Sequence, residues 1–277
     1  MTAPPSSYEP HKRTTFNRYR NRGTYDCLSI HSIVNSSPVV HVSFPPSREP
    51  DADPFPAILP MIGVMGSFES PGATLEEPMD LYLHGYVSSR LMRLSASARA
   101  GNGDNNGGSE SHDEGLPVSI AATKTDGIVL ALTPNNHSYN YRSAILHGFA
   151  RPVTSVEENL WAMELLTNNI VPDRWRSTRV PPNKAEMTST QILKVRIVSA
   201  SAKIRCGGPH DEKKDLRDGE VTQRVWTGVV PVWERLGAPV PGDDNRVAQV
   251  PAHVVDFVAK RNREREARAL QALQEPE

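Results

Sequence analysis

Cysteine and long apolar runs are both scarce in this chain of 277 residues. Two cysteines, Cys27 and Cys206, are too few for a disulfide framework or a four-thiolate zinc site. No apolar run approaches the roughly 18 residues that a membrane-spanning helix needs, and the first ten residues lack the apolar core of a signal peptide. The histidines show no spacing typical of a zinc motif, so we expect no metal. These absences predict a cytoplasmic protein with no membrane partner.

Surplus charge of one sign is also missing. Lys and Arg number 31 against 32 Asp and Glu, which gives a formal net charge of −1. This balance argues against a nucleic-acid partner, because phosphate contacts along a duplex need a surplus of basic side chains. It still allows a local basic pocket for one phosphate group. Motifs of nucleotide-binding loops, nucleophile elbows and zinc proteases are absent as well, so no motif assigns a reaction.

Proline, by contrast, is abundant, with 24 residues. Proline is poorly tolerated inside helices and central strands, so a helical bundle is excluded in favour of short strands joined by turns. Apolar stretches rich in β-branched residues predict strands at 39–44, 58–64, 79–84, 118–122, 128–132, 144–153, 191–204 and 225–233. Asp126-Gly127 is typical of a hairpin turn, and Pro60 predicts an edge strand or a bulge.

One helix start is clearly marked. Thr154 can cap it, Glu157 stands three residues later as in a capping box, and apolar residues follow at helical spacing to about residue 169. Strands joined by short turns, with few helices, predict a mainly β fold with peripheral helices, specifically an antiparallel barrel.

Three segments are expected to lie outside this barrel. Residues 1–12 are polar and predict a flexible arm. Residues 101–115 are almost wholly Gly, Asn, Asp, Ser and Glu and predict a disordered insertion. Residues 259–277 are rich in both charges and predict a solvated helix and tail. The rest, 13–258, is expected to form one domain.

Residues 81–92 carry a pattern typical of anion binding. A predicted strand ends at His84, Gly85 lets the backbone turn, and Ser88, Ser89 and Arg90 stand at the start of a helical pattern. Backbone N–H groups at a helix start, hydroxyls and a guanidinium together suit a phosphate monoester. The simpler alternative is a capped helix with Arg90 in solvent, since serine is common at such positions.

A second pattern lies at 139–150. It places Tyr141, Arg142 and Ser143 at a strand entrance, where rings and a hydroxyl could line a flat aromatic ligand. The alternative is an ordinary strand start with exposed polar groups.

In this order, the two segments resemble the flavin-nucleotide-binding branch of the pyridoxamine 5'-phosphate oxidase-like split-barrel family, which includes nitroimidazole-resistance-type proteins. The resemblance rests on His84-Gly85 before a basic helix start, on Tyr-Arg-Ser at 141–143, on Gly-x-Ala at 148–150 and on Val-Glu-Glu at 156–158. Segments 22–26, 226–231 and 239–241 are similar to the family's entry helix, closing strand and tail. The likeness covers about residues 13–258.

The resemblance implies a six-stranded antiparallel split β-barrel with Greek-key order that forms a homodimer and binds FMN at the dimer interface. It implies that the phosphate lies on the helix start beside His84 and that the isoalloxazine ring lies along the second predicted strand. Leu91 departs from the basic residue of the family pattern. The implied cofactor-binding residues are Pro60, Met61, Ile62, His84, Ser88, Ser89, Arg90, Arg142 and Ser143.

Three functions are compatible with this resemblance. The favoured one is an FMN-dependent oxidoreductase acting on a small organic substrate, in which the flavin itself carries the redox chemistry. The second is a flavin-binding protein without turnover. The third is a haem binder with His84 and His147 as axial ligands. The sequence assigns no catalytic residue, because no side chain is forced into an acid–base role.

Overall fold

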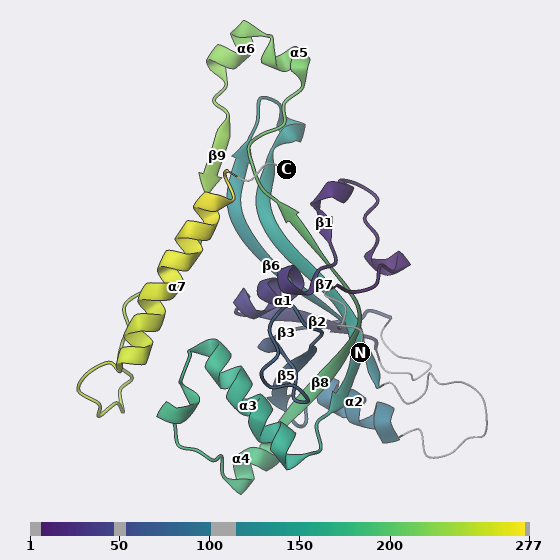
Figure 1. Ribbon diagram of the computed structural model, residues 1–277, viewed down its shortest axis with the longest axis vertical. Coiled ribbons are helices and arrows are strands. Elements are labelled where there is room, and N and C mark those ends of the chain that lie inside the picture. The colour runs from purple at the N-terminus through teal and green to yellow at the C-terminus, as the bar shows by residue number, and fades with distance from the viewer. Residues whose placement is uncertain (1–6, 47–53, 101–114, 275–277) are drawn as a thin grey trace, which may run out of the picture. The chain divides into compact units, whose positions relative to one another are not determined.

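The computed structural model describes residues 7–46, 54–100 and 115–274, so the predicted insertion lies outside the described residues except for Gly115 (Figure 1). The strands are β1 (Gly23–Thr24), β2 (Val40–Phe44), β3 (Ala57–Met61), β4 (Gly63–Gly66), β5 (Asp80–Tyr86), β6 (Leu116–Leu130), β7 (Ser138–Pro152), β8 (Thr190–Arg205) and β9 (Gly228–Pro231). The α-helices are α1 (Cys27–Ser36), α2 (Arg90–Ala100), α3 (Val156–Ile170), α4 (Lys184–Ser189), α5 (Lys213–Leu216), α6 (Gly219–Arg224) and α7 (Ala252–Gln271). The 3₁₀ turns are η1 (Lys12–Thr14), η2 (Arg20–Arg22), η3 (Pro134–Asn136) and η4 (Trp175–Ser177).

The chain divides into two compact units. The first comprises 1–18, 24–123 and 143–202, and the second comprises 19–23, 124–142 and 203–277. The predicted boundary at residue 258 falls inside α7. No helix of the described part of the chain is both long and apolar enough to cross a membrane.

A barrel of six strands lies largely in the first unit. The strand order is β3-β2-β6-β7-β8-β5-β4, and β3 and β4 are separated along the chain by Ile62 alone. Counted as one bent strand, they close this order on itself with six strands. The pairs β2–β3, β2–β6, β4–β5 and β5–β8 are antiparallel. The predicted mainly β class and split barrel are therefore confirmed, and β1 and β9 add two short strands to the sheet.

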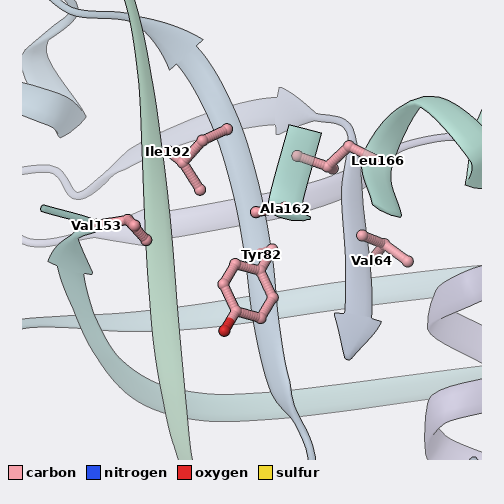
Figure 2. Packing of buried hydrophobic residues seen from close by; sticks show 6 residues of the cluster. All are labelled: Val64, Tyr82, Val153, Ala162, Leu166 and Ile192. Atoms are coloured by element: carbon pink, nitrogen blue, oxygen red, sulfur yellow. The ribbon is translucent and has the colours of Figure 1, made fainter. Parts of the chain in front are cut away.

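Successive side chains of β5 point alternately into the barrel interior and toward a helix outside the barrel. Leu81 and Leu83 stand opposite Val195 and Leu193 of β8, and all four are fully buried. Tyr82 points to the other face because successive strand residues alternate. There it packs with five further residues of a buried cluster (Figure 2), namely Val64, Val153, Ala162, Leu166 and Ile192. Ala162 and Leu166 belong to α3, so this helix covers the outer face of β5.

The start of α3 differs by one residue from the prediction. Ser155 is the N-cap, and its side chain accepts a hydrogen bond from the Glu158 backbone N–H at 3.2 Å. Thr154 lies one residue earlier and is exposed. The hydroxyl of either residue can cap a helix. A start after Ser155 is the one that turns Ala162 and Leu166 toward the sheet.

The predicted hairpin at Asp126-Gly127 is wrong. The strand β6 runs through both residues without a break, and the turn to β7 comes after Leu130. Gly127 allows a close approach of β9, because a Cβ there would lie 2.8 Å from the Val229 Cγ1. A glycine required by packing thus has the same sequence pattern as a glycine required by a turn.

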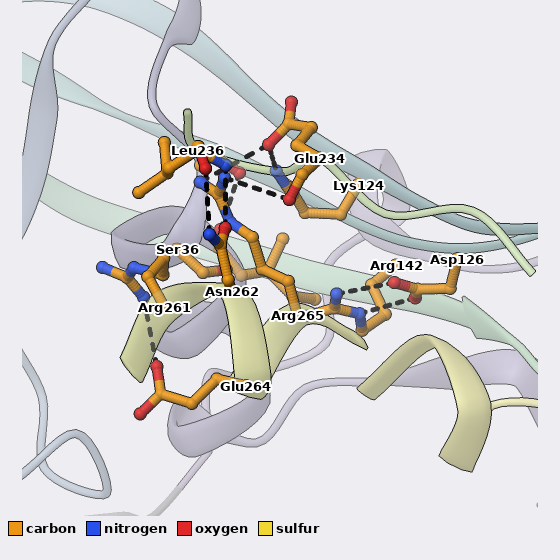
Figure 3. A network of polar contacts seen from close by, with 12 residues as sticks. Ser36, Lys124, Asp126, Arg142, Glu234, Leu236, Arg261, Asn262, Glu264 and Arg265 are labelled. Atoms are coloured by element: carbon orange, nitrogen blue, oxygen red, sulfur yellow. Dashed lines mark hydrogen bonds and ion pairs between the residues drawn. The ribbon is translucent and has the colours of Figure 1, made fainter. Parts of the chain in front are cut away.

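Polar contacts anchor α7 within the second unit (Figure 3). The Asn262 side chain donates to the Leu236 carbonyl oxygen at 2.9 Å and accepts from its N–H at 2.7 Å. The Glu234 carboxylate lies 2.5 Å from the Lys124 Nζ and 3.5 Å from the Arg265 Nη2. The residues before α7 are therefore held both to the helix and to β6.

The described part of the predicted N-terminal arm, residues 7–12, is attached to α1 and its entry. The Tyr8 N–H donates to the Tyr25 carbonyl oxygen at 2.9 Å, and the Tyr25 hydroxyl donates to the Thr14 carbonyl oxygen at 3.1 Å. The Tyr8 hydroxyl also bonds His31, a fully buried residue of α1, at 2.7 Å. These contacts fix the position of η1 on the first unit.

Candidate functional site

The bend between β3 and β4 forms one side of the predicted site. Pro60 stands opposite His41 of β2 and is exposed. Proline lacks an N–H, and β3 pairs with β2 alone, so this position on an edge suits it as expected. Ile62 follows Met61 and belongs to neither ladder, since β3 pairing ends at Met61 and β4 pairing starts at Gly63.

The turn from β5 into α2 forms the other side. The Ser89 N–H donates to the Tyr86 carbonyl oxygen at 2.9 Å, and the Arg93 N–H donates to the Ser89 carbonyl oxygen at 3.0 Å. Ser89 therefore immediately precedes the first residue of α2, Arg90. The hydroxyls of Ser88 and Ser89 and the Arg90 guanidinium have no hydrogen-bond partner among the described residues.

This helix start has the electrostatics of an anion site. The first backbone N–H groups of a helix have no partner within it, and the helix dipole places positive charge there. α2 has 11 residues, so the effect is that of a full helix. The two free hydroxyls and the exposed Arg90 guanidinium add donors around the same point.

Gly85 brings the two sides together. A Cβ at this position would lie 2.8 Å from the Met92 Cε and 3.6 Å from the Met61 Cε. Met92 is in the first turn of α2 and Met61 ends β3, so both elements pack over the same glycine. The structure thus joins the two predicted groups of residues, 60–62 and 84–90, which are separated in sequence.

His84 lies on the wall of a cavity of about 350 Å³. Ile62 lines the same cavity, with apolar side chains from α3 and the segment after it. His84 is exposed, and its ring has no hydrogen-bond partner among the described residues. Sequence patterns gave no indication that Met163 of α3, or Trp175 and Val180 of the segment after it, would line the same cavity as His84, because these residues are far from His84 in the sequence.

Arg142 has a different environment. Its Nε and Nη2 each lie 2.7 Å from an oxygen of Asp126, in a two-pronged ion pair within the second unit (Figure 3). Asp126 is almost fully buried, which makes this pair part of the structure of that unit. Ser143 belongs to the first unit and is half-buried. For both residues, a role in cofactor binding stays a prediction.

A second cavity, of about 540 Å³, surrounds a charge cluster that no motif had indicated. The Lys194 Nζ lies 2.6 Å from Glu69, 3.3 Å from Asp80 and 3.2 Å from Glu158. Burial raises the pKa of Asp80, and the charge of Lys194 opposes that rise. Glu158 also accepts a hydrogen bond from the Tyr82 hydroxyl at 2.8 Å. The lysine is thus held by neighbouring carboxylates and serves as an internal counter-ion.

Known proteins are similar to this chain in sequence and in fold. A family model described as pyridoxamine 5'-phosphate oxidase matches residues 27–204. No curated protein matches the sequence. The flavocytochrome Anf3 from Azotobacter vinelandii is 22% identical, with 90% of this chain and 98% of that chain covered and a TM-score of 0.67. The FAD and haem binding protein from Mycobacterium smegmatis is also 22% identical, with 86% and 97% covered and a TM-score of 0.65.

Proposed function

The chain belongs to the pyridoxamine 5'-phosphate oxidase family, and from this premise we propose that it binds a flavin nucleotide, FMN, at the β3–β4 bend and the start of α2. The observation that carries the proposal is the helix start itself. Two hydroxyls and a guanidinium that have no partner among the described residues stand at the N-terminus of α2, near a glycine whose missing Cβ lets Met61 of β3 approach. A phosphate monoester supplies the negative charge and the acceptor oxygens that such donors need.

The remaining contacts suit the ring of the cofactor. Ile62 is outside both ladders, so its peptide groups can hydrogen-bond the polar edge of an isoalloxazine. Pro60 and Met61 supply an apolar surface next to it. A bound flavin would supply electron and hydride transfer, while these residues would hold and orient it. We therefore favour an FMN-dependent oxidoreductase acting on a small organic substrate, with a flavin-binding protein without turnover as the alternative.

A haem site is a second candidate, favoured by His84. Of two solved structures with the same fold, one is named a flavocytochrome and the other an FAD and haem binding protein. His84 lines a largely apolar cavity of about 350 Å³ with an imidazole that has no partner in the described part of the chain, and imidazole is a common axial ligand of haem iron. His147, the other histidine considered, is hydrogen-bonded through Nδ1 to Ser119 and keeps Nε2 for a ligand.

We also propose a homodimer that covers the outer face of β2 and β3. Ile58 is 61% exposed and stands opposite Ser43, and the exposed Pro60 stands opposite His41. Directly paired residues share a face, so this edge of the barrel presents apolar surface beside the proposed ring site. Sedimentation of the flavin-bound protein as a 30.5 kDa species would contradict the dimer.

Combined replacement of Ser89 and Arg90 by alanine is expected to weaken FMN binding by at least about a hundredfold, because two hydrogen bonds to a charged group are lost and each contributes about 1.5–3 kcal/mol. The measurement is titration of the apoprotein with FMN, followed by flavin fluorescence. Arg93→Ala is the matched control, since Arg93 is also an exposed arginine and lies one turn further along α2.

Equal affinities of the double variant and Arg93→Ala would place the phosphate elsewhere. Parallel titrations with FAD and with haem separate the cofactor classes. Bleaching of the bound flavin by a nicotinamide reductant, with reoxidation by an added substrate, separates an enzyme from a binder without turnover.

A further inference from the structure

A cavity of about 280 Å³ lies on the outer face of the barrel, and none of its lining residues belongs to the helix start just described. Its polar lining comes from three neighbouring strands and from η1. Ser43 is on β2, Ser119 is on β6, His147 is on β7 and Arg13 is on η1. Pro45, Phe149 and other apolar side chains complete the walls.

Strand register sets the polar groups in a row. Ser43 and Ser119 are directly paired across β2 and β6. The Ser119 Oγ lies 2.9 Å from the His147 Nδ1. With the Ser119 hydroxyl donating to Nδ1, the Nε2–H of His147 is the donor left for a ligand. The Ser43 hydroxyl and this N–H are therefore two donors on the strands that flank β6, and Ser119 between them fixes the tautomer of the imidazole.

Arg13 adds a positively charged group to the lining of the same cavity. The Arg13 Nε donates to the His11 Nδ1 at 3.0 Å, which orients the guanidinium at the rim of the cavity. Burial and then the charges of Arg13 and His11 lower the pKa of His147. None of the described residues that line the cavity is a carboxylate. The 540 Å³ cavity differs sharply, because Glu69, Asp80 and Glu158 line it.

We propose that this cavity is a binding site for a phosphate-type oxyanion. A guanidinium, an imidazole N–H and the Ser43 hydroxyl match the acceptor oxygens of such an anion. The site is separate from the proposed cofactor phosphate site, since it shares no residue with the start of α2.

The source of the anion is either a free phosphorylated small molecule or the second phosphate of a dinucleotide cofactor. Both have the same recognised chemistry. Ser43 follows His41 by two residues on β2, and His41 stands opposite Pro60, so the cavity lies on the same strand face as the proposed ring site. This second source rests on the proposed function, because it needs the flavin at the β3–β4 bend.

The test is calorimetric titration of the full chain with inorganic pyrophosphate. Arg13→Gln with Ser119→Ala is expected to weaken binding at least about tenfold, because a charged donor is lost and His147 loses the hydroxyl that keeps the hydrogen on Nε2. Lys12→Gln, one residue away and outside the cavity lining, removes the same charge and is expected to change affinity by less than about twofold. The double variant at Ser89 and Arg90 is expected to retain this binding.

Three results would overturn the proposal: no binding of pyrophosphate by the wild-type protein, equal weakening by Lys12→Gln, or loss of binding only in the Ser89 and Arg90 variant. The last would direct pyrophosphate to the helix start and leave the proposed function standing. If Arg13→Gln selectively weakens FAD binding but not FMN binding, the source is a dinucleotide. If it affects neither while pyrophosphate binding falls, the source is a free phosphate compound.

Discussion

Gly148→Ala is expected to lower the free energy of unfolding by about 3 kcal/mol or more, since overpacking that shifts the backbone is among the costlier substitutions. A Cβ at Gly148 would lie 2.3 Å from the carbonyl oxygen of Arg196 on β8. Backbone cannot rotate away as a side chain can, so β7 and β8 must separate locally. Both strands are central in the barrel order, and the strain would reach His147 and Phe149 on either side.

Urea denaturation followed by tryptophan fluorescence measures the effect. Gly72→Ala is the matched control, because an added Cβ there meets nothing within 4 Å, and we expect it to change stability by less than about 0.5 kcal/mol. Equal midpoints for the two variants would show that β7 and β8 tolerate a wider separation than this packing suggests.

Acid is expected to destabilise the fold through His31, by about 3 kcal/mol between pH 6.5 and pH 4. His31 is fully buried, its Nδ1 lies 2.9 Å from the Leu75 carbonyl oxygen, and its Nε2 lies 2.7 Å from the Tyr8 hydroxyl. Nδ1 therefore carries the hydrogen and Nε2 accepts. Burial lowers the pKa of His31 to about 4, against 6.5 for an ordinary histidine.

The sign follows from proton binding. Between pH 6.5 and pH 4 the unfolded chain takes up a proton at His31 that the folded chain excludes, so stability is full above this window and falls as the pH drops through it. Protonation of Nε2 would also remove the acceptor of the Tyr8 hydroxyl. The segment that carries Arg13 would then lose one of its attachments to α1.

Unfolding free energies at several pH values between 7 and 4 give the measurement. His31→Gln removes the titrating group, so its stability should depend less on pH than that of the wild type, even though its absolute stability is lower. His137→Gln changes an exposed histidine and should keep the wild-type slope. Parallel curves for His31→Gln and wild type would disprove the assignment.

Local sequence patterns predicted elements whose stability is itself local. The helix at 156–170 was found to within a residue or two because capping and apolar spacing act within a few residues. The turn prediction at Asp126-Gly127 failed because turn preference is a local property. The contact of Gly127 with Val229 and the ion pair of Asp126 with Arg142 involve residues outside that local pattern. At these two residues, tertiary contacts determine the backbone conformation and override the local preference for a turn.

The candidate site divides in the same way. The group at 84–90 is contiguous, so its donors could be recognised together before the fold was known. Its contact with Met61 depends on Gly85 and on closure of the barrel, and only the family resemblance implied it. The row of Ser43, Ser119 and His147 arises from register between three strands, and no spacing in the sequence marks it.

The interleaving of the two units limits how this protein can be shortened. Residues 124–142 of the second unit are inserted between segments of the first, so no single cut of the chain removes one unit and spares the other. Truncation after residue 202 would delete β9, which pairs with Gly127–Leu130, and would uncover the fully buried Val129. The shortened chain would expose an open strand edge and tend to aggregate. The second unit thus contains segments of β6, β7 and β8, unlike a module joined to one end of the chain.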